Sequence, residues 1–221
     1  MIQTAPALLD LVAGRRGHFC LESGHHSGLW FDLDPLFADG QRIDPFVLAL
    51  ADAVRPFGVA AVCGPLVGGA FLAQLIARAV GAEFCFTERL EPAHSGGMYQ
   101  TRYRLPSAFA GRLRGKQVAV VDDVMSAGSA LRGTRAALES CGAVPVVVGA
   151  LLVLGSVGVD HFARQRLRVE AIARADYLIW QPADCPLCAA GLEIENVADG
   201  QLTDSPRASQ EELPVPSTEV H

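Results

Sequence analysis

Short runs rich in valine and alanine alternate along this chain with segments in which apolar positions recur every three or four residues. Runs of the first kind predict buried strands at 58–64, 82–88, 116–123 and 143–154. Segments of the second kind predict helices at 5–14, 42–54, 70–81 and 129–142. This alternation is typical of an α/β fold with a mainly parallel sheet flanked by helices.

Two loops rich in small residues follow predicted strands. The first covers Gly64–Gly69 and the second covers Asp122–Ser129. In open α/β sheets, ligands bind beyond the carboxyl ends of the strands. The sequence therefore predicts one ligand site that is formed by both loops.

Composition narrows the class of protein. The 221 residues are half hydrophobic, which is enough for one sizeable core, and the formal net charge of −6 argues against a broad nucleic-acid-binding surface. No basic segment followed by a long apolar core opens the chain, and the most apolar stretch, 143–159, contains Pro145 and three glycines. We therefore expect neither a secretory signal nor a membrane span. Four of the six cysteines lie in apolar segments, which is typical of a reduced, cytoplasmic protein.

The second loop begins with a pair of carboxylates, Asp122 and Asp123. Backbone amides of the following residues, at a helix N-terminus, favour an anion such as phosphate, and Ser126 and Ser129 add hydroxyl donors. The carboxylates would repel that phosphate, so they should face a neighbouring group; ribose hydroxyls donate well to carboxylates. The alternative is a solvated acidic turn followed by a helix cap at Ser129.

Several segments together resemble one family. The segment 118–130, VAVVDDVMSAGSA, resembles the phosphoribosyl-pyrophosphate-binding signature of type I phosphoribosyltransferases. The arm 17–32, GHFCLESGHHSGLWFD, resembles the N-terminal segment of the orotate phosphoribosyltransferases, and 180–192, WQPADCPLCAAGL, resembles the ending of one bacterial subgroup. The resemblance implies the type I phosphoribosyltransferase fold over residues 1–198. A small hood would come from about 1–40 and 165–198. Residues 199–221 are polar, proline-rich and unpatterned, which predicts a disordered tail.

The resemblance also implies an activity: Mg²⁺-dependent transfer of a phosphoribosyl group to orotate, giving orotidine 5′-monophosphate and pyrophosphate in pyrimidine synthesis, by a homodimer. Asp122 and Asp123 would hold the ribose, and Asp123 is also a candidate ligand of the Mg²⁺ bound to pyrophosphate. The other implied substrate-binding residues are Ser126, Ala127, Gly128 and Ser129 for the 5′-phosphate, Pro65, Leu66, Val67, Gly68 and Gly69 for pyrophosphate, and Trp30 and Phe31 beside the base.

The sequence departs from the family pattern at positions that matter for catalysis. The family usually has lysine at the positions of Glu22 and Gly68. The segment 86–106 occupies the place of the catalytic loop, and within it we expect Arg89 and Arg102 to serve the leaving group, with His94 and Arg104 as other candidates. The alternative is that these arginines form a solvated loop face.

A further departure concerns the base. Val153-Leu154 stands where the family usually has Asp-Arg, whose arginine pairs with the orotate carboxylate. An unpaired carboxylate in an apolar pocket is costly. Arg164 or Arg166 is a candidate replacement. The alternatives are a phosphoribosyltransferase for another purine or pyrimidine base, and a non-catalytic sensor of phosphoribosyl pyrophosphate.

The motif Cys185-Pro-Leu-Cys188 has the spacing of half a zinc site. A structural zinc needs four ligands, and sequence spacing reveals no second pair, with His161 and Cys141 as distant candidates. From the sequence we therefore expect no zinc at Cys185 and Cys188.

Overall fold

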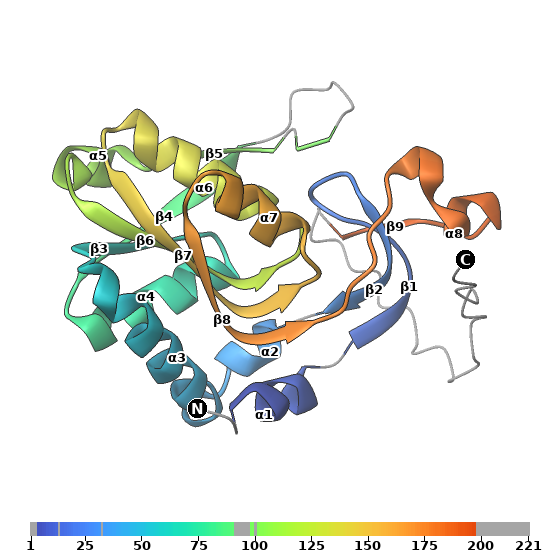
Figure 1. Ribbon diagram of the computed structural model, residues 1–221, viewed down its shortest axis with the longest axis horizontal. Coiled ribbons are helices and arrows are strands. Elements are labelled where there is room, and N and C mark those ends of the chain that lie inside the picture. The colour runs from blue at the N-terminus through green and yellow to red at the C-terminus, as the bar shows by residue number, and fades with distance from the viewer. Residues whose placement is uncertain (1–3, 13, 32, 91–97, 100, 198–221) are drawn as a thin grey trace.

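A six-stranded sheet forms the centre of the protein (Figure 1), whose computed structural model describes residues 4–197 apart from 13, 32, 91–97 and 100. The strand order is β5-β4-β3-β6-β7-β8, and every neighbouring pair is parallel except β4 and β5. The predicted mainly parallel α/β fold is confirmed. The strands are β3 (Ala61–Pro65), β4 (Glu83–Leu90), β5 (Arg102–Arg104), β6 (Gln117–Met125), β7 (Val144–Leu154) and β8 (Arg168–Ala175).

Helices cover both faces of this sheet, so its central strands are buried on both sides. On one face pack α1 (Thr4–Leu11), α3 (Gly40–Val54) and α4 (Gly68–Val80), and on the other α5 (Ser107–Leu113), α6 (Ser129–Ser140) and α7 (Val157–Arg164). The short helix α2 (Asp34–Phe37) precedes α3. No described helix is long and apolar enough to cross a membrane.

Strand β6 shows how the apolar run builds two cores at once. Successive side chains of a strand point to opposite faces. Accordingly Ala119 and Val121 join the core beneath α3 and α4, while Val118 and Val120 join the core beneath α6. All four side chains are fully buried. The continuous run of apolar residues that predicted a buried strand is thus a consequence of helices on both faces.

The predicted helices differ from the observed ones at their ends: α3 and α4 begin two residues earlier, and α1 and α6 end earlier than expected. Helix α4 begins at Gly68, inside the segment expected to be a loop, so that the glycines Gly68 and Gly69 form its first turn. It ends at Gly81, as predicted, where φ is +73°. Helix α3 contains Pro45 and is capped by Asp39, whose side chain accepts hydrogen bonds from the amides of Gln41 and Arg42.

A second, three-stranded sheet joins the two ends of the described chain. Strands β1 (Gly14–Cys20) and β2 (His26–Phe31) form an antiparallel hairpin, and β9 (Glu195–Asn196) pairs in parallel with β1. The turn between β1 and β2 lies at 21–25, with Gly24 at φ +81°. The short helix α8 (Pro186–Ala189) lies beside the hairpin at the right of Figure 1.

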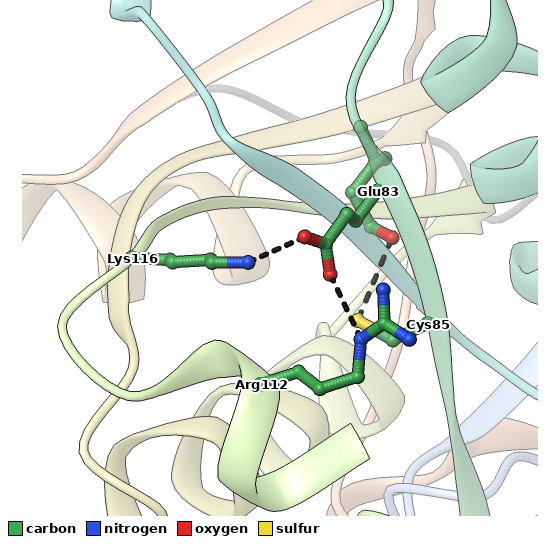
Figure 2. Close-up of polar contacts among 5 residues, drawn as sticks. Glu83, Cys85, Arg112 and Lys116 are labelled. Carbon is green, nitrogen blue, oxygen red and sulfur yellow. Dashed lines mark hydrogen bonds and ion pairs between the residues drawn. The ribbon is translucent and has the colours of Figure 1, made fainter. Parts of the chain in front are cut away.

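Charged groups join the edge of the sheet to the segment that enters β6. Figure 2 shows Glu83, at the start of β4, between Lys116 and Arg112, and both cations form ion pairs with its carboxylate. The hydrogen bond from Lys116 lowers the pKa of Glu83 below its usual value. Such surface pairs add little stability, because water screens them. The buried Cys85 thiol donates to the carbonyl of Val62 at 3.6 Å.

Candidate active site

Asp122 and Asp123 lie within β6, which continues for two more residues to Met125 before the loop begins. Asp122 pairs with Ala150 and Met125 with Val153 in the parallel ladder with β7, so both carboxylates project from a rigid strand. The chain then turns through Gly128, whose φ of +75° is strained for any residue with a Cβ, and α6 begins at Ser129. The amide of Gly158 donates to the carbonyl of Ser126 at 3.0 Å, which fixes the loop against α7.

The loop after β3 approaches the aspartates so closely that a side chain does not fit. A Cβ on Gly68 would lie 2.5 Å from Asp123 Oδ2, and a Cβ on Gly69 would lie 2.6 Å from Asp122 Oδ1. A Cβ on Gly64 would lie 1.9 Å from the carbonyl oxygen of Gly69. Gly68 and Gly69 are therefore required by contact between two loops that are far apart in sequence, and Gly64 by the tight turn of its own loop.

These loops line one cavity of about 260 Å³. Its wall is completed by residues of the β1–β2 turn and by Tyr103 of β5. The lining residues are Leu21, Glu22, Ser23, Pro65, Leu66, Val67, Gly68, Tyr103, Asp122, Asp123, Val124, Ser126, Gly128, Ser129 and Ala130. The prediction that the two loops form a single site agrees with this arrangement.

Three carboxyl groups face this cavity. Burial raises the pKa of Asp122 well above its usual value, and the neighbouring Asp123 raises it further. Burial also raises the pKa of Glu22, whose Oε2 accepts a hydrogen bond from the Tyr103 hydroxyl at 2.9 Å. Glu22 Oε1 is buried and, among the described residues, has no hydrogen-bond partner. Such a group of acids is suited to a ligand that supplies hydroxyl donors or a cation.

The opposite part of the cavity is suited to an anion. Ser129 opens the 12-residue helix α6, and its buried Oγ has no hydrogen-bond partner in the described part of the chain. The positive end of the helix dipole and the unpaired amides of the first turn lie at the same place. The cavity thus combines an anion-binding end with a carboxylate wall.

Comparison with known proteins agrees with this arrangement. A sequence model of the phosphoribosyl transferase domain matches residues 52–168. An orotate phosphoribosyltransferase of Thermotoga petrophila is 32% identical over 179 residues, covering 81% of this chain and 88% of that relative. The chain belongs to the orotate phosphoribosyltransferase family. An orotate phosphoribosyltransferase of Desulforamulus reducens is also 32% identical, over 85% of this chain and 91% of that protein.

A solved structure shares the fold of this transferase. The crystal structure of orotate phosphoribosyltransferase from Aeropyrum pernix superimposes with a TM-score of 0.59 and 21% sequence identity, covering 78% of this chain and 94% of that one. The predicted type I phosphoribosyltransferase fold and enzyme class are thus confirmed.

Most of the residues predicted to bind substrate meet at the transferase cavity. Asp122, Asp123, Ser126, Gly128, Ser129 and the loop 65–68 line it directly. Two others support it from behind: Ala127 is buried, and Gly69 packs against Asp122.

The predicted base-pocket residues do not line this cavity. Trp30 and Phe31 belong to β2 and are absent from its lining. The Phe31 ring packs against Tyr177, with 6.3 Å between centroids, and the guanidinium of Arg15 lies 5.9 Å from the Trp30 ring.

The three arginines of the predicted catalytic loop lie on two paired strands, β4 and β5. Arg89 pairs with Tyr103 in the β4–β5 ladder, and its charge acts on Glu22. Arg102 is exposed on β5, and Arg104 binds Glu88 at 2.8 Å. His94, another candidate, lies outside the described residues, as does the predicted tail at 199–221.

Sequence reasoning missed the part of the cavity that β5 and the arm provide. Tyr103 is buried between two exposed arginines, so the Arg-Tyr-Arg alternation of a strand was the available signal. Glu22 was noticed as a departure from the family pattern and not as a member of the site. Its partner, Tyr103, is 81 residues away and cannot be inferred from local pattern.

Sequence spacing also failed to find a second pair of ligands for Cys185 and Cys188. The fold supplies His18 and His26, because the β1–β2 hairpin brings these two residues together against α8. The two distant candidates have other partners. His161 Nε2 lies 2.8 Å from Gln165 Nε2, and the Cys141 thiol donates to the carbonyl of Leu138.

Substituting Gly69 with alanine should impair phosphoribosyl transfer without unfolding the protein. The new Cβ would meet Asp122 Oδ1 and Pro65 Cδ, both at 2.6 Å, and displace one of them. A shift of about 1 Å in a site typically costs on the order of 100-fold in rate, and we expect a loss of that size in kcat/KM. Gly111→Ala is the matched control, because no heavy atom lies within 4 Å of its Cβ position and alanine favours helix α5. Equal activity of the two variants would contradict the interlocking of the loops.

Substituting Asp122 with asparagine should stabilise the ligand-free protein, since it removes a buried acid beside Asp123 while keeping the oxygen that accepts from the Asp123 amide at 3.1 Å. Each kcal/mol of relief corresponds to a rise of about 2–4 °C in the thermal midpoint. Because the folded-state pKa of Asp122 is raised, the wild type loses stability as pH rises through that value. The gain should therefore grow with pH in thermal melts. The exposed Asp52→Asn is the control, and a midpoint lowered at every pH would refute the account.

Proposed function

We propose that this transferase moves the phosphoribosyl group of phosphoribosyl pyrophosphate onto orotate, producing orotidine 5′-monophosphate and pyrophosphate in pyrimidine synthesis. The observation that carries the proposal is the pairing, in one cavity, of an anion-binding helix end with two adjacent carboxyl groups. Relatives that are 32% identical over most of the chain carry the name orotate phosphoribosyltransferase, which supports orotate as the base.

The phosphate end is assigned to the loop before α6. The buried Ser129 hydroxyl can donate to a phosphate oxygen, since it has no hydrogen-bond partner among the described residues. The backbone amides in the first turn of α6 add further donors. Ser126 lies in the same lining, and its carbonyl is already fixed by Gly158. A 5′-phosphate bound here leaves the ribose within reach of Asp122 and Asp123, whose carboxylates accept from its hydroxyls.

The leaving pyrophosphate is assigned to the loop 65–68 and the first turn of α4. This loop lies against the same two carboxylates, and the N-terminus of α4 favours negative charge. Asp123 and Glu22 Oε1, which has no hydrogen-bond partner among the described residues, are oxygen ligands of the type that Mg²⁺ prefers, so the residues present fit that ion. Bound Mg²⁺ would neutralise the charge that develops on the departing pyrophosphate.

The roles of these residues in catalysis follow from the charges that develop on the ribose and on the leaving pyrophosphate. As the bond from ribose C1 to the pyrophosphate oxygen breaks, its electron pair leaves with the oxygen and positive charge develops on the ribose ring. A nitrogen of the base attacks C1 from the opposite face, with inversion, and the proton of that nitrogen passes to the departing pyrophosphate. Asp122 and Asp123 stabilise the ring charge, and the glycine amides and the arginine candidates Arg89 and Arg102 stabilise the leaving group. Holding both reactants in one cavity supplies much of the rate increase.

A carboxylated base needs a cation that the usual position does not provide. Val153 and Leu154 are both buried and apolar. We assign the role to Arg132, which lies one turn after Ser129 on α6 and therefore on the same helix face. Its guanidinium is 4.1 Å from the Tyr99 ring centre, and the Tyr99 amide donates to the carbonyl of Ser23 at 3.0 Å, in the cavity lining. The buried Arg132 Nε has no hydrogen-bond partner among the described residues.

A second candidate function is transfer to another purine or pyrimidine base. It is favoured by the apolar side chains at 153–154 and by Glu22, an acid where the family pattern has lysine. A base without a carboxylate would need neither an arginine at 153–154 nor a lysine at position 22.

Pyrophosphate release with Mg²⁺, phosphoribosyl pyrophosphate and a panel of bases tests these alternatives. We expect release with orotate, and none from the double variant Asp122→Asn with Asp123→Asn. Arg132→Met should lower kcat/KM for orotate by about 10–100-fold, the cost of about 1–3 kcal/mol for an unpaired buried group, while leaving affinity for phosphoribosyl pyrophosphate unchanged.

Other outcomes reassign the function. Release with a neutral base alone would establish the second candidate. Tight binding of phosphoribosyl pyrophosphate without release by any base would indicate a sensor. Arg135→Met, at a residue of α6 paired with Glu139, is the matched control, and an equal loss in that variant would remove the assignment to Arg132.

We also infer that two copies associate and that the protein works in the cytoplasm. The family resemblance supports the dimer, and six free cysteines support a reducing compartment. Sedimentation velocity should give twice the chain mass of 23.4 kDa at micromolar concentration. A mass of one chain under these conditions would contradict the dimer.

A further inference from the structure

Four potential metal ligands meet outside the substrate cavity, at the junction of the N-terminal hairpin with the C-terminal segment. They are His18 of β1, His26 of β2, Cys185 at the start of α8 and Cys188 within it. One ligand atom from each lies within 4.8 Å of every other. None of the four belongs to the cavity lining.

The spacing of these atoms matches a tetrahedral zinc site. With bond lengths of about 2.0–2.1 Å to nitrogen and 2.3 Å to sulfur, tetrahedral geometry separates two nitrogens by about 3.3 Å and a nitrogen from a sulfur by about 3.6 Å. His18 Nε2 lies 3.2 Å from His26 Nδ1 and 3.5 Å from Cys185 Sγ. Cys188 Sγ lies 3.6 Å from His18 Nε2 and 3.3 Å from His26 Nδ1.

The surrounding groups orient the ligands for binding. His18 Nδ1 lies 2.9 Å from the carbonyl of Leu192, which accepts its proton and leaves the Nε2 lone pair directed at the cluster. The amide of His26 donates to the carbonyl of Trp180 at 2.8 Å, and the amide of Trp180 returns a bond at 2.9 Å. Both histidines and Cys185 are buried. Backbone pairing thus holds the histidines against the cysteine motif.

We propose that His18, His26, Cys185 and Cys188 bind one Zn²⁺ in a structural site. Two thiolates balance the charge of the ion, and four protein ligands complete its coordination, so no position is open for catalysis. The ion would fasten the arm to the C-terminal segment, alongside the ion pair between Arg15 and Glu195 at 3.0 Å. It would thereby position the turn 21–23, which lines the substrate cavity.

Metal content of the purified full chain tests the proposal. Protein is produced in zinc-supplemented medium, dialysed against chelator and analysed by inductively coupled plasma mass spectrometry. It should retain roughly one zinc per chain, as a closed four-ligand site does. Cys188→Ser and His26→Asn should each lose most of it. Cys141→Ser and His161→Asn are matched controls, because both residues lie outside the cluster, and they should retain the metal. Zinc removal under denaturing conditions should lower the thermal midpoint after refolding.

A second measurement keeps the proposal testable if the ligand variants do not fold. Refolding the wild type with Co²⁺ should give the intense visible bands of a tetrahedral ion and thiolate-to-metal charge transfer in the near ultraviolet. Folded wild type that retains no zinc and gives only a weak octahedral Co²⁺ spectrum would overturn the proposal. Full zinc content in both ligand variants would also overturn it.

Discussion

The contact between the β3–α4 loop and the two aspartates of β6 is the constraint on which the site depends. Backbone of Gly68 and Gly69 lies where any side chain would collide with a carboxylate. The contact requires the neighbouring strands to hold both loops at one height, which the parallel pairing of Ala61 with Val118 through Cys63 with Val120 achieves. The sheet therefore determines the distance between the two binding loops, and the helices on its two faces keep it rigid.

That contact also restricts position 68 of this chain to glycine. A long side chain at Gly68 would have to pass Asp123, which a Cβ would meet at 2.5 Å. In this chain the aspartate occupies that space, so the charge balance of the cavity shifts toward acid. Glu22 adds a third carboxyl group, partly compensated by Tyr103 and Arg89. Because carboxyl groups predominate in the cavity, its ligands must supply the compensating cations and hydrogen-bond donors.

The sequence was most informative where one residue pattern determines one local structure. The valine run ending in Asp122-Asp123 predicted both a buried strand and the carboxylates at its end, and Gly81 predicted the end of α4. It was least informative where distant segments meet. Tyr103 reaches Glu22 across 81 residues, and Cys185 reaches His18 across 167. The second contact lies where β1 pairs with β9 and His26 with Trp180, and neither pairing leaves a periodic signal in the sequence.

The edges of the central sheet bear on how copies of the chain meet. On one side the sheet ends in β5, a strand of three residues whose two exposed side chains are arginines. On the other it ends in β8, where Arg168 and Arg174 are exposed and Arg174 donates to the carbonyl of Val169 at 3.0 Å. A very short edge strand at β5 and exposed arginines at both edges oppose the addition of further strands from another molecule. Extension of the central sheet by a strand of another molecule is therefore disfavoured.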